Sequence, residues 1–145
     1  MKQDCFVFDI DGTLADHEGV RSPFDESKVY YDKPIDPVWK VLRALRLANY
    51  KIIFLSGRTE KCRTDTLMWL TEHLGEGEYT RFVDLLMRKV GDNRNDAIVK
   101  QEIYDAIVLP YYNVIGVFDD RMRVCRMLYD KGLFVFNVNQ GLKEF

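Results

Sequence analysis

Five short apolar runs alternate with helical patterns along this chain, and this alternation limits the possible folds more than any other feature. The runs cover residues 5–8, 51–55, 82–87, 114–118 and 133–138. They are brief and rich in β-branched and aromatic residues, which favours strands over helices. Strands separated by helices predict an α/β fold in which a mainly parallel sheet of about five strands is covered on both faces.

Four segments between the runs carry apolar residues at helical spacing. Asp36 is expected to be the N-cap of the first helix, with Pro37 at its first position. The second pattern covers residues 66–74, and the fourth covers residues 121–131. The third covers residues 96–109, and its buried face is expected to consist of Val99, Ile103, Ala106 and Ile107.

Polar residues that suit catalysis follow three of the predicted strands. They are Asp9 and Asp11 after the first strand, Ser56, Gly57 and Arg58 after the second, and Asp119 and Asp120 after the fourth. Ligand sites of parallel α/β sheets lie outside the carboxyl ends of the strands. We therefore expect these three groups to meet at one edge of the sheet.

The first of these groups suggests phosphoryl chemistry. Asp9 and Asp11 are two residues apart, so at a strand end their carboxylates are expected to point the same way. Facing carboxylates repel unless a cation lies near them, and Mg²⁺ prefers oxygen ligands. One carboxylate can then attack phosphorus while the other moves a proton. The alternative is a plain Asp-Gly turn after a strand, completed by Gly12.

The other polar residues also have structural alternatives. The Ser56 hydroxyl suits a phosphate, but serine is equally common as a helix N-cap. Arg58 offers a bidentate fork to phosphate oxygens, or it is a solvated arginine in a charged segment. Lys100 can neutralise charge on a transferring phosphoryl group, or it forms a surface pair with Asp96.

These motifs resemble those of a known protein family. The run Asp9-Ile10-Asp11-Gly12-Thr13 after an apolar strand resembles the first motif of the haloacid dehalogenase (HAD) superfamily of phosphotransferases. Ser56-Gly57-Arg58 resembles its second motif, Lys100 its third and Asp119-Asp120 its fourth. The resemblance implies a Rossmann-like, three-layer HAD fold with a minimal cap.

Three segments sharpen the resemblance to one branch, the 3′-phosphatase domain of phage polynucleotide kinase. They are Arg21-Ser22-Pro23-Phe24-Asp25, Gly91-Asp92-Asn93-Arg94-Asn95-Asp96 followed by Lys100, and Asp119-Asp120-Arg121. Arg21 lies in a polar stretch, residues 15–34, that by itself reads as a flexible loop. The resemblance implies a flap over about residues 15–35, whose arginine reaches the substrate.

The same resemblance implies roles in catalysis. Asp9 would be the nucleophile, and Asp11 would protonate the leaving alcohol and then activate water. Mg²⁺ would be held by Asp9, the backbone carbonyl of Asp11 and Asp120. Asp119 is expected beside the metal, and adjacent carboxylates leave its direct contact open.

A second set of implied roles concerns the phosphate. Lys100 would stabilise the transferring phosphoryl group, positioned by Asp96. The groups expected to bind phosphate or substrate are Arg21, Ser56, Gly57, Arg58 and Asp96. A basic rim that could follow a polynucleotide is expected from Arg81, Arg88, Lys89, Arg94, Arg121, Arg123 and Arg126.

Three functions remain open from these motifs. The first is a phosphatase acting on 3′-phosphates or 2′,3′-cyclic phosphates at polynucleotide ends, DNA or RNA. The second is a nucleotide or small-molecule phosphatase with the same chemistry. The third is a phosphoacceptor receiver module, in which an aspartate rather than Ser56 would be expected after the second strand.

Other sequence features bear on the partners, the domain content and the location of the protein. The chain of 145 residues has a net charge of −2, which argues against electrostatic binding of long duplex DNA. It contains no Gly-x-x-x-x-Gly-Lys-Ser/Thr run, so one phosphatase domain over 1–145 without a kinase domain is expected. No membrane span or signal peptide is indicated, and a cytoplasmic protein is expected, in the host cytoplasm if a phage encodes it. The oligomeric state is not indicated.

Overall fold

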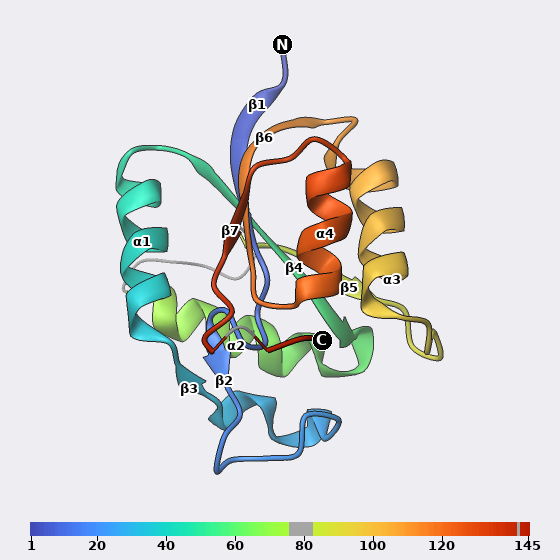
Figure 1. The fold of residues 1–145 in the computed structure, drawn as a ribbon. Coiled ribbons are helices and arrows are strands. Elements are labelled where there is room, and N and C mark those ends of the chain that lie inside the picture. Colours follow the sequence, from blue (N-terminus) through green and yellow to red (C-terminus); the bar gives the residue numbers. More distant parts are fainter. Residues whose placement is uncertain (76–82, 142) are drawn as a thin grey trace.

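The computed structural model describes residues 1–75, 83–141 and 143–145. Within them, a five-stranded sheet lies between two pairs of helices (Figure 1). The strand order is β5-β4-β1-β6-β7, and every neighbouring pair is parallel. The predicted α/β class, the three-layer Rossmann-like architecture and the mainly parallel sheet are therefore confirmed.

Each predicted apolar run contributes one strand of this sheet. The strands are β1 (Gln3–Phe8), β4 (Lys51–Thr59), β5 (Asp84–Arg88), β6 (Tyr112–Asp119) and β7 (Val135–Asn137). The predicted start of the third run, Phe82, lies outside the described residues. The helices are α1 (Asp36–Leu47), α2 (Arg63–Leu74), α3 (Asp96–Ile103) and α4 (Met122–Asp130).

The central strand β1 explains why the apolar runs are continuous. Phe6 and Phe8 belong to the core cluster under α1 and α2, whereas Cys5 and Val7 belong to the cluster under α3 and α4. Successive residues of a strand point to opposite faces, so a strand covered on both faces needs apolar residues at every position. Burial of both faces fixes the register of β1 and therefore the place where Asp9 leaves the sheet.

The start of α1 differs from the prediction by one residue. Ile35 is the N-cap, without a side-chain cap, and Asp36 lies in the first turn together with Pro37. The predicted N-cap role of Asp36 is therefore wrong. In the first turn its carboxylate still suits the positive end of the helix dipole.

The third helix departs from the predicted pattern at its end. After α3 the chain continues as a π-helical turn, η4 (Tyr104–Val108), with a hydrogen bond from Leu109 N–H to the Tyr104 carbonyl. This wider turn rotates the following residues, so Tyr104 and Val108 are buried while Ile107 is 47% exposed. The expected burial of Ala106 and Ile107 is wrong for that reason.

The polar stretch after β1 forms an ordered flap. It contains a two-stranded antiparallel sheet of β2 (Ala15–Asp16) and β3 (Lys33–Pro34), with the 3₁₀-helix η1 (Glu26–Tyr31) between them. The core helices hold both ends of the flap through indole N–H groups. Trp39 donates to the Leu14 carbonyl at 3.0 Å, and Trp69 donates to the Asp32 carbonyl at 2.8 Å.

Two further observations concern the cysteines and membrane crossing. The three cysteines are free and buried. Among the described helices, none has both the length and the apolar character that a membrane crossing requires.

Candidate active site

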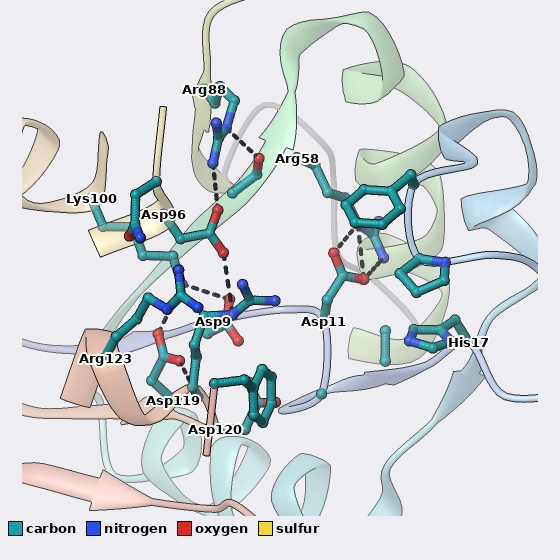
Figure 2. A pocket seen from close by; sticks show the side chains of 18 of the residues that line it. Asp9, Asp11, His17, Arg58, Arg88, Asp96, Lys100, Asp119, Asp120 and Arg123 are labelled. Carbon is teal, nitrogen blue, oxygen red and sulfur yellow. Dashed lines mark hydrogen bonds and ion pairs between the residues drawn. The ribbon is translucent and has the colours of Figure 1, made fainter. Parts of the chain in front are cut away.

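The predicted polar residues gather around one pocket at the carboxyl edge of the sheet (Figure 2). The pocket has a volume of about 1020 Å³ and is lined from several elements. Because β1 lies between β4 and β6, the residues after β1 are neighbours of those at the ends of both other strands. Every predicted site residue except Ser56 lines this pocket.

Lys100 lies at the centre of a group of buried charged side chains. Its ammonium donates to Asp9 Oδ1 and to Asp119 Oδ2, both at 2.8 Å, and the residue is only 3% exposed. Burial by itself would lower the pKa of Lys100, but the charges of Asp119 and Asp9 outweigh it and raise that pKa well above its usual value. Lys100 is therefore a permanent cation, held by these two carboxylates and not by Asp96 as expected.

Asp9, Asp119 and Asp120 form an acidic cluster. One carboxylate oxygen from each lies within 4.8 Å of the others, which suits an ion with oxygen ligands. Burial and the charge of Asp9 raise the pKa of both Asp119 and Asp120. Thr13 donates to Asp9 Oδ2 at 3.0 Å. The cluster thus has more negative charge than Lys100 neutralises, and a divalent cation would relieve the repulsion.

Asp11 points away from this cluster, contrary to the expectation that it would face with Asp9. The strand ends at Phe8, so neither residue belongs to it, and the chain turns from Ile10 onward, where the Ile10 carbonyl accepts the N–H groups of Thr13 and Leu14 at 3.1 and 2.8 Å. Arg58 donates to Asp11 from Nε at 3.1 Å and from Nη2 at 2.8 Å. Arg21 adds a bond from Nη2 at 2.9 Å. Two arginines therefore fix Asp11 in place.

These contacts set the protonation state of Asp11. Partial burial works to raise the pKa of its carboxyl. The charge and hydrogen bonds of Arg58, together with the charge of Arg21, outweigh that effect and leave the pKa below its usual value. Asp11 is a carboxylate in this state, and about a third of its side chain (37%) remains exposed to the pocket.

Asp32 completes the arginine network, and sequence reasoning missed it. Its carboxylate accepts from Arg21 Nε and Nη2 at 2.9 and 2.8 Å, and from Arg58 Nη2 at 3.0 Å. Its side chain is fully buried. The sequence offers little signal for it, because Asp32 follows Tyr31 in an aperiodic stretch. We call Asp11, Asp32, Arg21 and Arg58 the arginine clamp.

The clamp changes the interpretation of its two arginines. Arg58 is 3% exposed, so the alternative of a solvated arginine is wrong. Its fork engages Asp11, and its third nitrogen donates to Thr66 Oγ1 at 3.0 Å. The Arg21 side chain is only 1% exposed and donates inward to the clamp. Contact of either arginine with phosphate remains a prediction.

Ser56 lies within β4, one residue before the pocket wall. The strand continues to Thr59 and α2 begins at Arg63, so Ser56 is not a helix N-cap. Its hydroxyl oxygen accepts the backbone N–H of Arg58 at 3.0 Å, and the residue is 1% exposed. Ser56 therefore helps to fix the strand backbone that presents Arg58, and its contact with phosphate remains a prediction.

Asp96 binds arginines rather than Lys100. It is the first residue of α3; its Oδ1 accepts from Arg88, and its Oδ2 lies 3.4 Å from Arg121 Nε. A Cβ on Gly57 would lie 2.9 Å from Asp96 Oδ1, so glycine permits this close approach of β4 to α3. Arg88 is largely buried by these contacts and also donates to the Gly57 carbonyl at 2.8 Å.

His17 also lines the pocket, on the side of Asp11 (Figure 2). The sequence carries no partner motif for it. The other histidine, His73, packs against the rings of Trp39 and Trp69. Of the predicted basic rim, Arg88, Arg94, Arg121 and Arg123 line the pocket, while Arg81 lies outside the described residues.

Comparisons with known proteins agree with this geometry. Residues 3–142 match the family model described as the polynucleotide kinase PNKP phosphatase domain. The chain is 33% identical over 140 residues to a proposed bifunctional polynucleotide kinase/RNA ligase of Autographa californica nuclear polyhedrosis virus. That alignment covers 94% of this chain and 20% of the viral protein.

Solved structures show the same relationship. A chain in the structure of the Pnkp1/Rnl/Hen1 RNA repair complex is 32% identical, with a TM-score of 0.87 over 98% of this chain and 44% of that chain. The class C acid phosphatase from Bacillus anthracis shares the fold, with a TM-score of 0.62 at 13% identity over 94% of this chain and 66% of that chain. This chain spans less than half the length of the first two relatives. It belongs to the HAD family of polynucleotide kinase phosphatase domains and is a phosphatase, a phosphoric monoester hydrolase.

Proposed function

We propose that the protein is a Mg²⁺-dependent phosphatase that removes a 3′-phosphate, or a 2′,3′-cyclic phosphate, from polynucleotide ends through an aspartyl-phosphate on Asp9. One observation carries this proposal: the two carboxylates of the first motif have separate counter-cations. Asp9 lies against Lys100, and Asp11 is held by the arginine clamp. A nucleophile and a proton-transfer group in distinct environments are what displacement at phosphorus requires.

The reaction then divides into two balanced steps. A carboxylate oxygen of Asp9 forms a bond to phosphorus while the bond to the leaving oxygen breaks, and Asp11 gives that oxygen its proton. Water next attacks the aspartyl-phosphate and gives a proton to Asp11, which releases phosphate and restores Asp9. The lowered pKa of Asp11 suits the second step. In the first step, the negative charge of the bound phosphate favours the protonated form of Asp11.

The acidic cluster is the proposed Mg²⁺ site. Asp9, Asp119 and Asp120 offer one oxygen each within 4.8 Å, and the backbone carbonyl of Asp11 is a further expected ligand. Oxygen-only donors suit Mg²⁺ rather than a metal that prefers nitrogen or sulfur. When bound, the ion would neutralise charge on the phosphoryl oxygens. Lys100 would contribute to the same stabilisation from the buried side.

Gly12 provides a test of this metal site. A Cβ at this position would lie 2.0 Å from Asp120 Oδ2, and the φ of +80° disfavours any side chain. We expect Gly12→Ala to displace Asp120 and to weaken Mg²⁺ binding at least about tenfold, the effect of losing roughly 1.4 kcal/mol. Thermal unfolding with increasing Mg²⁺ measures the affinity in each variant.

Gly19→Ala is the matched control for this test. Gly19 has a φ of +73°, but its nearest neighbouring atom, Lys33 Nζ, is 4.0 Å away from the added Cβ. It therefore reproduces the backbone strain without the clash, and its Mg²⁺ affinity should equal that of the wild type. If Gly12→Ala bound Mg²⁺ with wild-type affinity, the assignment of Asp120 as a metal ligand would be wrong.

The substrate is proposed from the pocket and the relatives together. Arg94, Arg121, Arg123 and Lys143 line the pocket and give it cations for backbone phosphates despite the acidic total charge. The names of the relatives refer to polynucleotide kinase, RNA ligase and RNA repair. We therefore place a polynucleotide 3′ end, including RNA, ahead of a free nucleotide. The direct phosphate contacts are proposed for Ser56, Gly57 and Arg58.

A substrate panel tests this function. The enzyme with Mg²⁺ is incubated with 3′-phosphorylated oligonucleotides, 5′-phosphorylated oligonucleotides, mononucleotides and an aryl phosphate, and phosphate release is measured. We expect the 3′-phosphorylated ends to have the highest kcat/KM, and chelation of the metal to abolish release. Efficient turnover of mononucleotides without release from oligonucleotides would instead identify a nucleotidase.

A further inference from the structure

The pocket is larger than a phosphate group requires. Its volume of about 1020 Å³ matches the upper end of cavities that hold whole organic ligands, roughly 300–1,000 Å³. Lys100 and the acidic cluster line one part of it. His17 lines the part beside Asp11 (Figure 2), and the flap residues Pro23 and Phe24 also line the pocket. The flap side therefore has room for the group that carries the phosphate.

The proposed chemistry, on which this inference rests, determines which way that group points. In phosphoryl transfer the attacking and leaving oxygens lie roughly in line on opposite sides of phosphorus. If Asp9 attacks, the leaving oxygen faces away from Asp9 and must come within hydrogen-bond reach of Asp11. Arg21, a residue of the flap, donates a hydrogen bond from Nη2 to Asp11 Oδ1 at 2.9 Å. The nucleoside that leaves is thus directed toward the flap.

His17 is a polar group on this side of the pocket. The residue is half-buried in the wall and lies on the same side as Asp11 (Figure 2). The backbone carbonyl of His17 accepts the N–H groups of Val20 and Arg21 at 2.9 and 3.2 Å, which fixes the loop. Among the described residues, nothing forms a hydrogen bond with its imidazole. The ring nitrogens are therefore free to bind a ligand.

Phe24 provides an apolar surface at the mouth of the same pocket. It is 93% exposed, although the loop that carries it is held by a hydrogen bond from Arg21 to the Pro23 carbonyl at 3.2 Å. A single exposed apolar side chain needs no explanation by itself. An exposed ring on the wall of a pocket for nucleic-acid ends is different, because aromatic side chains stack on bases.

We propose that His17 and Phe24 form the subsite for the 3′-terminal nucleoside. His17 binds the ribose 2′-hydroxyl, and Phe24 stacks on the base. The 2′-hydroxyl is on the carbon adjacent to the one that carries the 3′ oxygen, so a ring beside Asp11 can reach it when Asp11 meets the leaving oxygen. A 2′-hydroxyl contact distinguishes RNA from DNA. The enzyme therefore prefers ends that terminate in a ribonucleotide.

The experiment compares three 3′-phosphorylated oligonucleotides of one sequence, which end in a ribonucleotide, a 2′-deoxynucleotide or an abasic ribose. The wild type should favour the ribonucleotide over the deoxynucleotide by about five- to tenfold, the worth of one hydrogen bond. His17→Ala should lose this preference by slowing only the ribonucleotide end, and His17→Gln should restore part of it. Phe24→Ala should raise KM at least about fivefold for ends with a base and leave the abasic end unchanged.

Tyr31→Ala is the matched control for Phe24→Ala. Tyr31 is another exposed aromatic residue of the flap, at 70%, and it is not one of the residues that line the pocket. Its kinetics should equal those of the wild type. The subsite would be refuted if His17→Ala lost equal activity on ribonucleotide and deoxynucleotide ends. It would also be refuted if Phe24→Ala kept the wild-type KM for ends with a base. Failure of the wild type on all three ends would instead refute the proposed function.

Discussion

Replacing Asp9 by asparagine is expected to abolish phosphate release, with a loss in kcat of at least about 10⁴, the scale seen when a nucleophile is removed. The amide cannot form the aspartyl-phosphate, because it lacks the negative charge that attacks phosphorus. The fold should persist, because the asparagine oxygen can still accept from Lys100, 2.8 Å away, and one repulsive charge leaves the cluster. Steady-state kinetics with circular dichroism measures both effects.

Asp4→Asn is the control for this substitution. Asp4 lies on the same strand at its exposed end, where its side chain accepts from Asn113 at 2.8 Å. Its removal should leave activity within a factor of about two, as surface changes usually do. A folded Asp9→Asn variant with wild-type turnover would refute the nucleophile assignment. Trapping of phosphate on the wild-type chain, lost in the variant, would give independent support.

Asp32→Ala is expected to have the second-largest effect, although Asp32 is proposed to touch no substrate. The change leaves Arg21 and Arg58 buried against Asp11 alone, with one uncompensated positive charge. Breaking a buried ion pair typically costs about 3–5 kcal/mol, so the unfolding temperature should fall by roughly 10–20 °C. Asp11 should shift with its arginines, and a shift of about 1 Å can reduce kcat on the order of 100-fold.

Two further measurements separate positioning from mere unfolding. Kinetics below the unfolding transition should show the loss in kcat with little change in Mg²⁺ affinity, because the clamp arginines contact the carboxylate of Asp11 and not its backbone carbonyl. Asp32→Asn should also fail, since its amide group would face an arginine donor. Asp130→Asn, an exposed aspartate on α4, should behave as the wild type. Full activity in folded Asp32→Ala would show that the clamp is dispensable.

The sequence predictions that proved correct concern features that depend on local patterns of residues. Strand residues such as Val7 and Phe54 are apolar because both faces of the sheet are covered, so their runs predict the five strands. The chain then places Asp9 and Asp119 at strand ends, and parallel pairing brings those ends together. The motif resemblance added Lys100, which indeed lies against both carboxylates.

The sequence errors concern contacts between distant segments and the local geometry of turns. Period-two alternation put Asp11 beside Asp9, but β1 ends at Phe8 and the chain turns from Ile10 onward. Helical spacing put Ile107 in the core, but the π-helical turn moves it to the surface. Spacing within α3 paired Asp96 with Lys100, yet the buried lysine donates to Asp9 after β1 and to Asp119 at the end of β6. In each case a local rule yielded to a stronger tertiary contact.

By itself, the sequence determined the fold class, the edge of the sheet that carries the site and most of the charged residues around it. Only the tertiary structure decided which cation neutralises which carboxylate. Arg58 meets Asp11 across 47 residues and Lys100 meets Asp9 across 91 residues, because β4 pairs with β1 and α3 packs against the same sheet. Asp32 enters the site only through the flap. Electrostatic partnership depends on distance in space and on burial, and neither is contained in the spacing of residues along the chain.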